Sequence, residues 1–236
     1  MKMQWVIRRL LFIIRIYPKR VARLFTYYFH PFYVKPKFRA FPFMLAECLL
    51  IFDIYEILSN IFKKNIRLLT DAEILRGSQI FGKSIDFQLV MIDDKAHYVV
   101  RDKVIAYVSF NTINSHGALP PDIFIHELVH VWQYQNFGAG YIIQALWAQR
   151  TKAGYNYTDV TAKGVRQVRW WDLKSIHQFN GEQQGDLVQD YYRLKTGLRA
   201  QWEYHFTMKD LWKYERFIDE IKGAIGHDLA DTTDFH

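Results

Sequence analysis

The feature that most constrains this chain is a His-Glu-Leu-Val-His motif that begins at His126. The surrounding run, residues 122–135, predicts one helix, with Asp122 as its cap after two prolines and with Gly138 and Gly140 to end it. Residues four apart share one face of a helix, so His126 and His130 can bind one metal ion together. Glu127 lies about 100° further round, placed to reach a water on that metal. The spacing predicts two nitrogen ligands for zinc and a carboxylate general base. The alternative is an amphipathic helix with two hydrogen-bonded histidines.

A second motif lies about fifty residues downstream. Asn180 and Gln183 have the spacing of a capping box, and Gly197 is a plausible stop, so a helix is expected to begin near Glu182. Glu182 and Asp186 then share one face of this helix. Glu182 can be a third metal ligand, and Asp186 can accept the free ring N–H of a ligating histidine. The alternative is that acids in a first turn only favour the helix dipole.

These motifs resemble those of the gluzincin class of zinc metallopeptidases, in which two His and a downstream Glu bind the metal. The residues at 126–135, 144–146 and 182–184 also resemble those of a narrower group of proteins. These are small bacterial metallopeptidase-like domains encoded near type VI secretion and extracellular contractile injection systems. The resemblance covers about residues 70–195.

The resemblance implies a zinc site with these ligands: His126, His130 and Glu182. It implies Glu127 as the general base, with Asp186 orienting a ligand from behind. The metzincin class is excluded, because its pattern needs Gly and His where this chain has Gln133 and Asn136.

The pattern along the chain favours an α+β fold: a mostly helical zincin-like domain with a small antiparallel sheet before the motif helix. A helix is expected over 70–82, and residues 85–92 alternate with period two, as in a strand. Runs at 98–100 and 104–110 also predict strands. By resemblance, 104–110 is an edge strand that pairs with an extended substrate; the alternative is a buried hairpin. Further helices are expected at 141–149 and 207–225.

Three regions are expected: an N-terminal helical arm (1–65), the metallopeptidase-like domain (66–226) and an acidic tail (227–236). The connection between His130 and Glu182 is long enough to form one wall of a cleft. Hydrolysis at zinc needs a hydrogen-bond donor for the oxyanion. Several residues can supply it, although core packing is the alternative for each: Tyr155, Tyr157, His177, Tyr192 and His205.

The N-terminal arm carries the basic charge of the protein. Residues 1–40 hold ten Lys or Arg and no acid, although the whole chain is only +7. The run 3–16 predicts an amphipathic helix, either on an anionic membrane or acidic partner, or packed on the body of the protein. Its arginines exclude a spanning helix and a signal peptide. Residues 43–62 predict another amphipathic helix. The single cysteine, Cys48, fits a reducing compartment. The expectation is a cytoplasmic protein, peripheral on a membrane at most.

Two functions follow from these features. The first is a zinc-dependent metallopeptidase that hydrolyses peptide bonds of a peptide or protein substrate. The alternative is a non-catalytic, zinc-braced module of a secretion or injection system. No nucleic-acid partner is expected, because the basic charge is confined to the arm.

Overall fold

The computed structural model describes residues 2–26, 41–96, 106–142, 154–158 and 169–223. The expected α+β fold is confirmed: helices surround one four-stranded sheet. The described helices and strands are α1 Lys2–Thr26, α2 Phe41–Cys48, α3 Ile51–Phe62, β1 Ile66–Leu68, α4 Asp71–Phe81, β2 Met91–Asp93, β3 Ala106–Ser109, β4 Thr112–Ser115, α5 Pro121–Phe137, α7 Gly181–Lys195 and α8 Trp212–Gly223.

The sheet is mixed, so the expectation of an antiparallel sheet was wrong. Its order is β1-β2-β4-β3, with β1 antiparallel to β2, β3 antiparallel to β4, and β2 parallel to β4. The parallel pair arises because the chain forms the β3–β4 hairpin before it returns to β2, and the second strand of that hairpin is the one that pairs with β2. The hairpin turns at Phe110, whose φ is 60°, and Asn111, whose backbone N–H donates to Glu56 at 2.7 Å.

The period-two run at 85–92 forms a strand only at its end. Phe87–Leu89 is a 3-10 turn, and the Asp86 side chain accepts a hydrogen bond from the Gln88 N–H there. Such a local side-chain bond offers the backbone an alternative to strand pairing. The run at 104–110 forms β3 over 106–109, at the edge of the sheet as expected. Residues 98–100 and most of 141–149 lie outside the described part.

The starts of α4 and α7 follow the sequence signals, whereas the start of α5 does not. Capping boxes start α4 at Thr70 and α7 at Asn180, and Gly197 has a φ of 81° just after α7. Asp122, however, is not the cap of α5, because Pro120 occupies that position. Its carboxylate instead accepts hydrogen bonds from Arg193 and Gln189 and so ties α5 to α7. The expected C-terminal helix is α8, preceded by the 3-10 turn Met208–Asp210.

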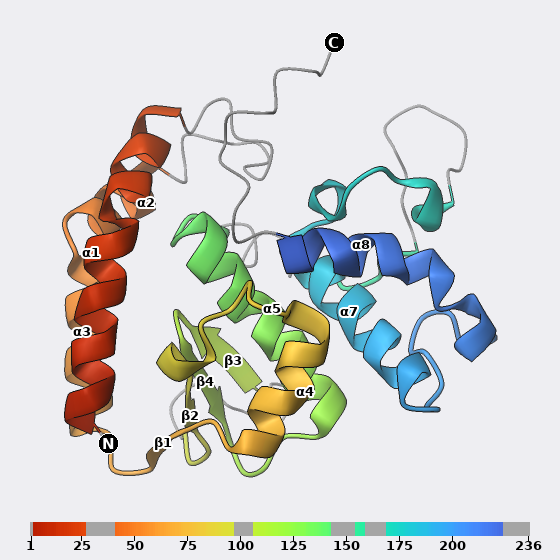
Figure 1. Ribbon diagram of the computed structural model, residues 1–236, viewed down its shortest axis with the longest axis horizontal. Coiled ribbons are helices and arrows are strands. Elements are labelled where there is room, and N and C mark those ends of the chain that lie inside the picture. The colour runs from red at the N-terminus through yellow and green to blue at the C-terminus, as the bar shows by residue number, and fades with distance from the viewer. Residues whose placement is uncertain (1, 27–40, 97–105, 143–153, 159–168, 224–236) are drawn as a thin grey trace.

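The hydrophobic core lies between α5, α7, α8 and the sheet. Helix α5 is buried on almost every side, including Val129 and Trp132. Leu187 of α7 and Phe217 of α8 pack into the same core. Figure 1 shows α5 at the centre of the molecule with α7 beside it. A helix that is apolar all round is buried on all sides. The two histidines of α5 therefore lie inside the protein and not at its surface.

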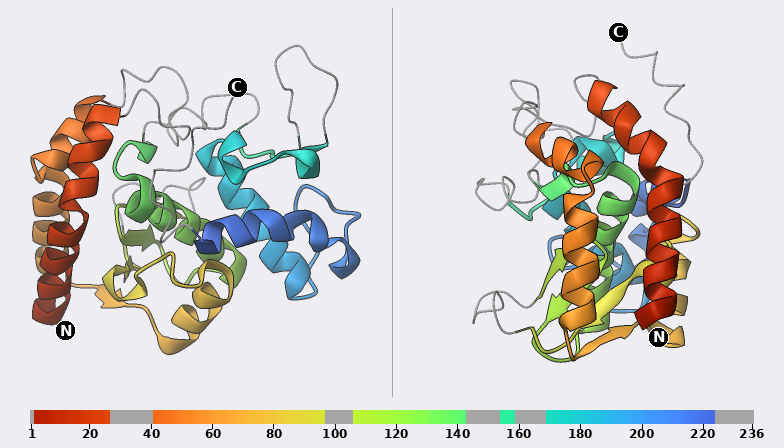
Figure 2. Two further views of the ribbon diagram at one scale, coloured as in Figure 1. Left: turned by 45° about the horizontal axis from the view of Figure 1, so that its top comes forward. Right: turned by 90° about the vertical axis from the view of Figure 1, so that its left-hand side faces the viewer.

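Helices α1, α2 and α3 form a layer on one side of the body. Figure 2 shows α1 and α3 side by side, with the rest of the molecule behind them. The expected single helix at 43–62 is two helices, because Leu50 adopts a left-handed conformation with a φ of 59°. Among the described residues, no helix is long and apolar enough to cross a membrane.

The acidic side chains of this layer face inward. Asp53 is only 1% exposed and pairs with Arg9 at 2.8 Å and with Arg20. Glu56 also pairs with Arg9 at 2.8 Å, and the phenol of Tyr134 in α5 accepts a hydrogen bond from Arg9. The three helices are therefore joined to each other and to α5 by a buried network of charges.

We expect Asp53→Ala to destabilise the protein strongly. Removing this carboxylate takes one acidic partner from each of two buried guanidinium groups, and breaking a buried pair costs about 3–5 kcal/mol. The matched control is Asp172→Ala, because the Asp172–Arg169 pair is exposed and contributes at most about 1 kcal/mol. Urea unfolding of both variants measures the difference. Equal losses would contradict the structural role of the network.

Candidate metal centre

Helices α5 and α7 bring three predicted site residues together. His126, His130 and Glu182 each offer one ligand atom, and these atoms lie within 4.8 Å of one another. The Nε2 atoms of both histidines are 3.4 Å from the same Oε2 atom of Glu182. All three side chains are buried. Residues 52 or more positions apart in the sequence thus converge on one point, which can hold a metal ion.

The far side of each imidazole is held by a second side chain. His126 Nδ1 lies 2.9 Å from Asp186 Oδ1, the residue expected to orient it. His130 Nδ1 lies 2.9 Å from Oε1 of Gln133. A carboxylate and an amide oxygen can only accept, so each Nδ1 carries the proton. Each Nε2 of a neutral imidazole then presents its lone pair toward Glu182.

Gln133 and Asp186, which bond to the two imidazoles, are themselves held by hydrogen bonds. The Gln133 amide donates from Nε2 to the carbonyl of Gly181 at 3.0 Å and to the side chain of Gln184 at 2.9 Å. This fixes which end of the amide meets His130. Asp186 accepts a hydrogen bond from the indole of Trp202. Outer partners of this kind set the orientation and basicity of metal ligands.

This arrangement attracts a cation. Two lone pairs and a carboxylate oxygen that face one another repel unless positive charge lies between them. Burial by itself lowers the pKa of His126, but Asp186 and Glu182 outweigh it and raise that pKa well above its ordinary value. Burial likewise raises the pKa of Glu182, yet the neighbouring charge of His130 brings it far below its usual range. The raised pKa of His126 and the lowered pKa of Glu182 have the same cause: the cluster favours positive charge.

Glu127 stands beside the cluster without being part of it. Its side chain is buried, and its Oε2 atom has no hydrogen-bond partner among the described residues. Burial raises the pKa of its carboxyl group, and the charges of His126 and His130 oppose that rise. A buried carboxylate oxygen without a partner is costly for folding, so it points to a functional use.

Gly185 allows the two helices to approach closely at this point. A Cβ atom built on Gly185 would lie 2.5 Å from Cε1 of His126. Only a residue without a side chain fits there. The sequence offered no direct signal for this contact, because a glycine in a helix has several explanations.

One of the five candidate oxyanion donors lies beside the cluster. The ring of Tyr155 is 6.1 Å from that of His126. Tyr157 instead bonds Asp190 and Tyr214 in the core, and His177 stacks on Trp132.

The other two candidates, Tyr192 and His205, show no such approach among the described contacts. Tyr192 packs against the core, and His205 is exposed beside Glu203. Sequence reasoning missed Tyr141, whose ring stacks on that of His130 at 6.4 Å. Its signal was only that of an apolar helix, so nothing in the sequence singled it out.

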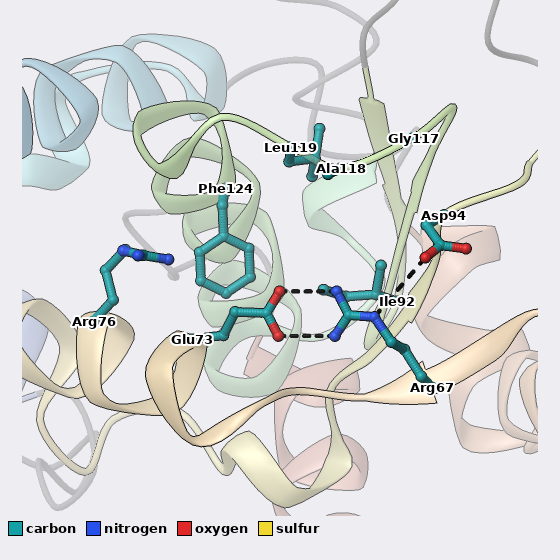
Figure 3. A pocket seen from close by; sticks show the side chains of 9 residues that line it. All are labelled: Arg67, Glu73, Arg76, Ile92, Asp94, Gly117, Ala118, Leu119 and Phe124. Atoms are coloured by element: carbon teal, nitrogen blue, oxygen red, sulfur yellow. Dashed lines mark hydrogen bonds and ion pairs between the residues drawn. The ribbon is translucent and has the colours of Figure 1, made fainter.

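A small cavity elsewhere in the protein does not compete as the functional site. It lies between β1, α4 and α5, and Arg67 closes it through ion pairs with Glu73 and Asp94 (Figure 3). Its volume is about 70 Å³. Ligand sites need several hundred cubic ångströms. None of the five predicted site residues lines it.

The comparisons with known proteins gave one relative. The chain is 28% identical over 149 residues to the type VI secretion system spike protein VgrG2b of Pseudomonas aeruginosa. The match covers 55% of this chain and 13% of that protein, so this chain corresponds to a small part of its relative. No family model matches the sequence, and no solved structure matches it significantly. Similarity to a secretion-system protein agrees with the secretion-system part of the sequence resemblance.

We expect Gly185→Ala to lower the free energy of unfolding by about 1–3 kcal/mol, because its methyl group would overlap the His126 ring. Gly181→Ala is the matched control in the same helix. The nearest atom to its added Cβ is 3.4 Å away, so the neighbouring side chain needs little adjustment. Thermal or urea unfolding of the two variants measures this. A Gly185→Ala protein as stable as Gly181→Ala would contradict the close approach.

Proposed function

We propose that this protein is a zinc-dependent peptide hydrolase in which His126, His130 and Glu182 hold the metal. The observation that carries the proposal is the pair of imidazoles, both held at Nδ1 and both directed by Nε2 at one carboxylate oxygen. Zinc at such a site lowers the pKa of a water toward neutrality and polarises a carbonyl group.

The spacing of the donor atoms supports zinc. Bonds of about 2.0–2.1 Å in a tetrahedral site place two ligand atoms about 3.3–3.4 Å apart. The two separations of 3.4 Å between the histidine nitrogens and Glu182 agree with that spacing. They are longer than a typical N–H···O hydrogen bond of about 2.9–3.0 Å. Two imidazoles and one carboxylate are also a donor set typical of catalytic zinc.

Glu127 is the general base in this proposal. Its free, buried oxygen accepts a proton from the attacking water as the water oxygen bonds to the carbonyl carbon of the substrate. It then passes the proton to the leaving amine nitrogen as the C–N bond breaks. Tyr155, beside His126, is the candidate donor to the carbonyl oxygen. The edge strand β3 offers backbone groups to an extended peptide.

The biological setting proposed is a secretion or injection system. The similarity to VgrG2b supports this setting, although it covers only a small part of that protein. A peptide or protein is the substrate in this proposal, because the backbone groups of an edge strand such as β3 can pair with an extended main chain. Which protein serves as substrate depends on residues that contact its side chains.

A second function retains the metal but not the reaction. Ligands as buried as His126, His130 and Glu182 are also typical of structural zinc, so the same cluster can brace a binding module. The unpartnered oxygen of Glu127 favours the hydrolase, because a purely structural site has no use for it. The two functions differ in one outcome: zinc without turnover supports the binding module.

We expect about one zinc per chain in the purified protein, measured by mass spectrometry of the metal, as for a three-ligand catalytic site. His126→Ala and Glu182→Ala each remove a ligand and should lower that content sharply. His205→Ala is the matched control, because this histidine is exposed and is not near the cluster. Zinc that stays at the parental level in Glu182→Ala would remove Glu182 from the ligand set.

We expect Glu127→Gln to keep its zinc and to lose peptide hydrolysis by about 10²–10⁴-fold, because the amide cannot accept the proton. The readout is the appearance of new N-termini in a library of unstructured peptides, detected by mass spectrometry. Glu215→Gln on the surface of α8 is the control. Activity that survives in zinc-loaded Glu127→Gln would exclude Glu127 as the base.

A further inference from the structure

The layer formed by α1, α2 and α3 is apolar on its outer side. Most of the large apolar side chains that are exposed in the described residues belong to these three helices, although together they make up a minor part of the chain. On α1 the exposed positions recur every three or four residues, which is one face of a helix. Examples from α1 and α3 are Met3, Ile7, Leu11, Ile14, Ile54 and Leu58.

The charges of the same layer are sorted by sign. In residues 2–26 and 41–65, every acidic side chain is buried: Glu47, Asp53 and Glu56. Three arginines form ion pairs with these acids: Arg9, Arg20 and Arg23. The exposed charges that remain in these two stretches are all basic: Arg8, Arg15, Lys19 and Lys64. The outer side is therefore apolar with a positive margin.

The positive margin lies along one flank of the apolar face of α1. With 100° per residue, Arg8, Arg15 and Lys19 fall within about 40° of one another. They adjoin the apolar stripe that contains Ile7 and Leu11. An apolar stripe flanked by basic residues is the pattern of a helix that lies in the interface of an anionic membrane.

We propose that this layer binds the surface of an anionic lipid bilayer, with the outer faces of α1 and α3 buried at the boundary between headgroups and acyl chains. Charge complementarity selects this occupant, because the exposed charges of the layer are of one sign. The exposed apolar side chains belong to helices that run side by side (Figure 2). The charged ends of the basic side chains contact anionic headgroups. The aliphatic parts of these side chains and the apolar residues enter the acyl region.

The buried ion pairs explain how charged residues can face the interior of such a layer. An ordinary surface helix turns its apolar side to the core, whereas α3 turns Asp53 and Glu56 inward and apolar residues outward. Helix α1 buries Arg9 and Arg20 beside apolar residues such as Trp5. Arg9 and Arg20 satisfy Asp53 and Glu56 inside the layer, so the outward side is free to be apolar. The layer lies flat on the bilayer rather than crossing it, in agreement with the lack of a spanning helix among the described ones.

The inference is independent of the proposed hydrolase, because none of the cluster residues belongs to this layer. It proposes where the protein is located, which is at the surface of an anionic membrane. Tyr134 of α5 accepts a hydrogen bond from Arg9, so the helix that carries both histidines is joined directly to the layer. A protein held in this way presents its metal cluster at a set position relative to the bilayer.

The test is sedimentation of the full chain with vesicles of phosphatidylcholine containing phosphatidylserine, compared with vesicles of phosphatidylcholine alone. We expect binding to the anionic vesicles, weakened by high salt. Leu11→Glu should reduce the binding about tenfold or more, the change expected when one buried leucine is lost from the interface. Leu75→Glu is the matched control, because Leu11 and Leu75 are both 62% exposed but Leu75 lies on α4.

The electrostatic part has its own variant. Arg8→Ala combined with Arg15→Ala should weaken binding to anionic vesicles severalfold or more and leave the weak binding to neutral vesicles unchanged. Glu127→Gln should bind vesicles like the parent. The test of membrane binding is therefore independent of the test of peptide hydrolysis.

Three outcomes would overturn the proposal. The first is failure of the full chain to sediment with anionic vesicles, and the second is equal binding by Leu11→Glu and Leu75→Glu. The third is a stable dimer in lipid-free solution, seen by analytical ultracentrifugation, that Leu11→Glu converts to a monomer. That result would assign the apolar side to a second copy of the chain.

Discussion

The contact between α5 and α7 is the interaction on which the candidate site depends. Each helix carries part of the cluster: two histidines on α5, and Glu182 with Asp186 on α7. Neither helix alone can hold a metal with three protein ligands. Gly185 lets the helices meet at the ring of His126, and Asp122 joins them again through Arg193. The same packing that forms the core therefore also forms the site.

The cluster is built from the outside inward. Trp202 holds Asp186, Gln184 holds Gln133, and these in turn hold the two imidazoles. Such a network removes rotational freedom from the ligands before any metal binds, which lowers the entropic cost of binding. Within the part of the chain that the structure describes, Oε2 of Glu127 has no hydrogen-bond partner, like the hydroxyl of Tyr141 beside His130.

The N-terminal layer follows a different physical rule from the rest of the protein. Around α5 the apolar side chains are inside, and in α1 and α3 the acids are inside with their arginines. Buried ion pairs contribute little net stability over apolar packing, but breaking one is costly. Their value here is geometric: they join the layer to Tyr134 of α5 and leave its outer side apolar. Helix α5 thus carries both histidines of the candidate metal site and the tyrosine that contacts the layer.

Local signals in the sequence determined the helices and the members of the site. The spacing of His126 and His130, and the capping box at Asn180 and Gln183, depend only on the geometry of one helix, so they were predictable. Gln133 and Tyr141 were missed, because their roles come from contacts between elements. Tertiary structure alone decided that β2 and β4 run parallel and that the acids of α3 face inward. A helical wheel shows that polar and apolar residues lie on opposite sides, but only the partner helix, with Arg9 and Arg20 opposite Asp53, decides which side is buried.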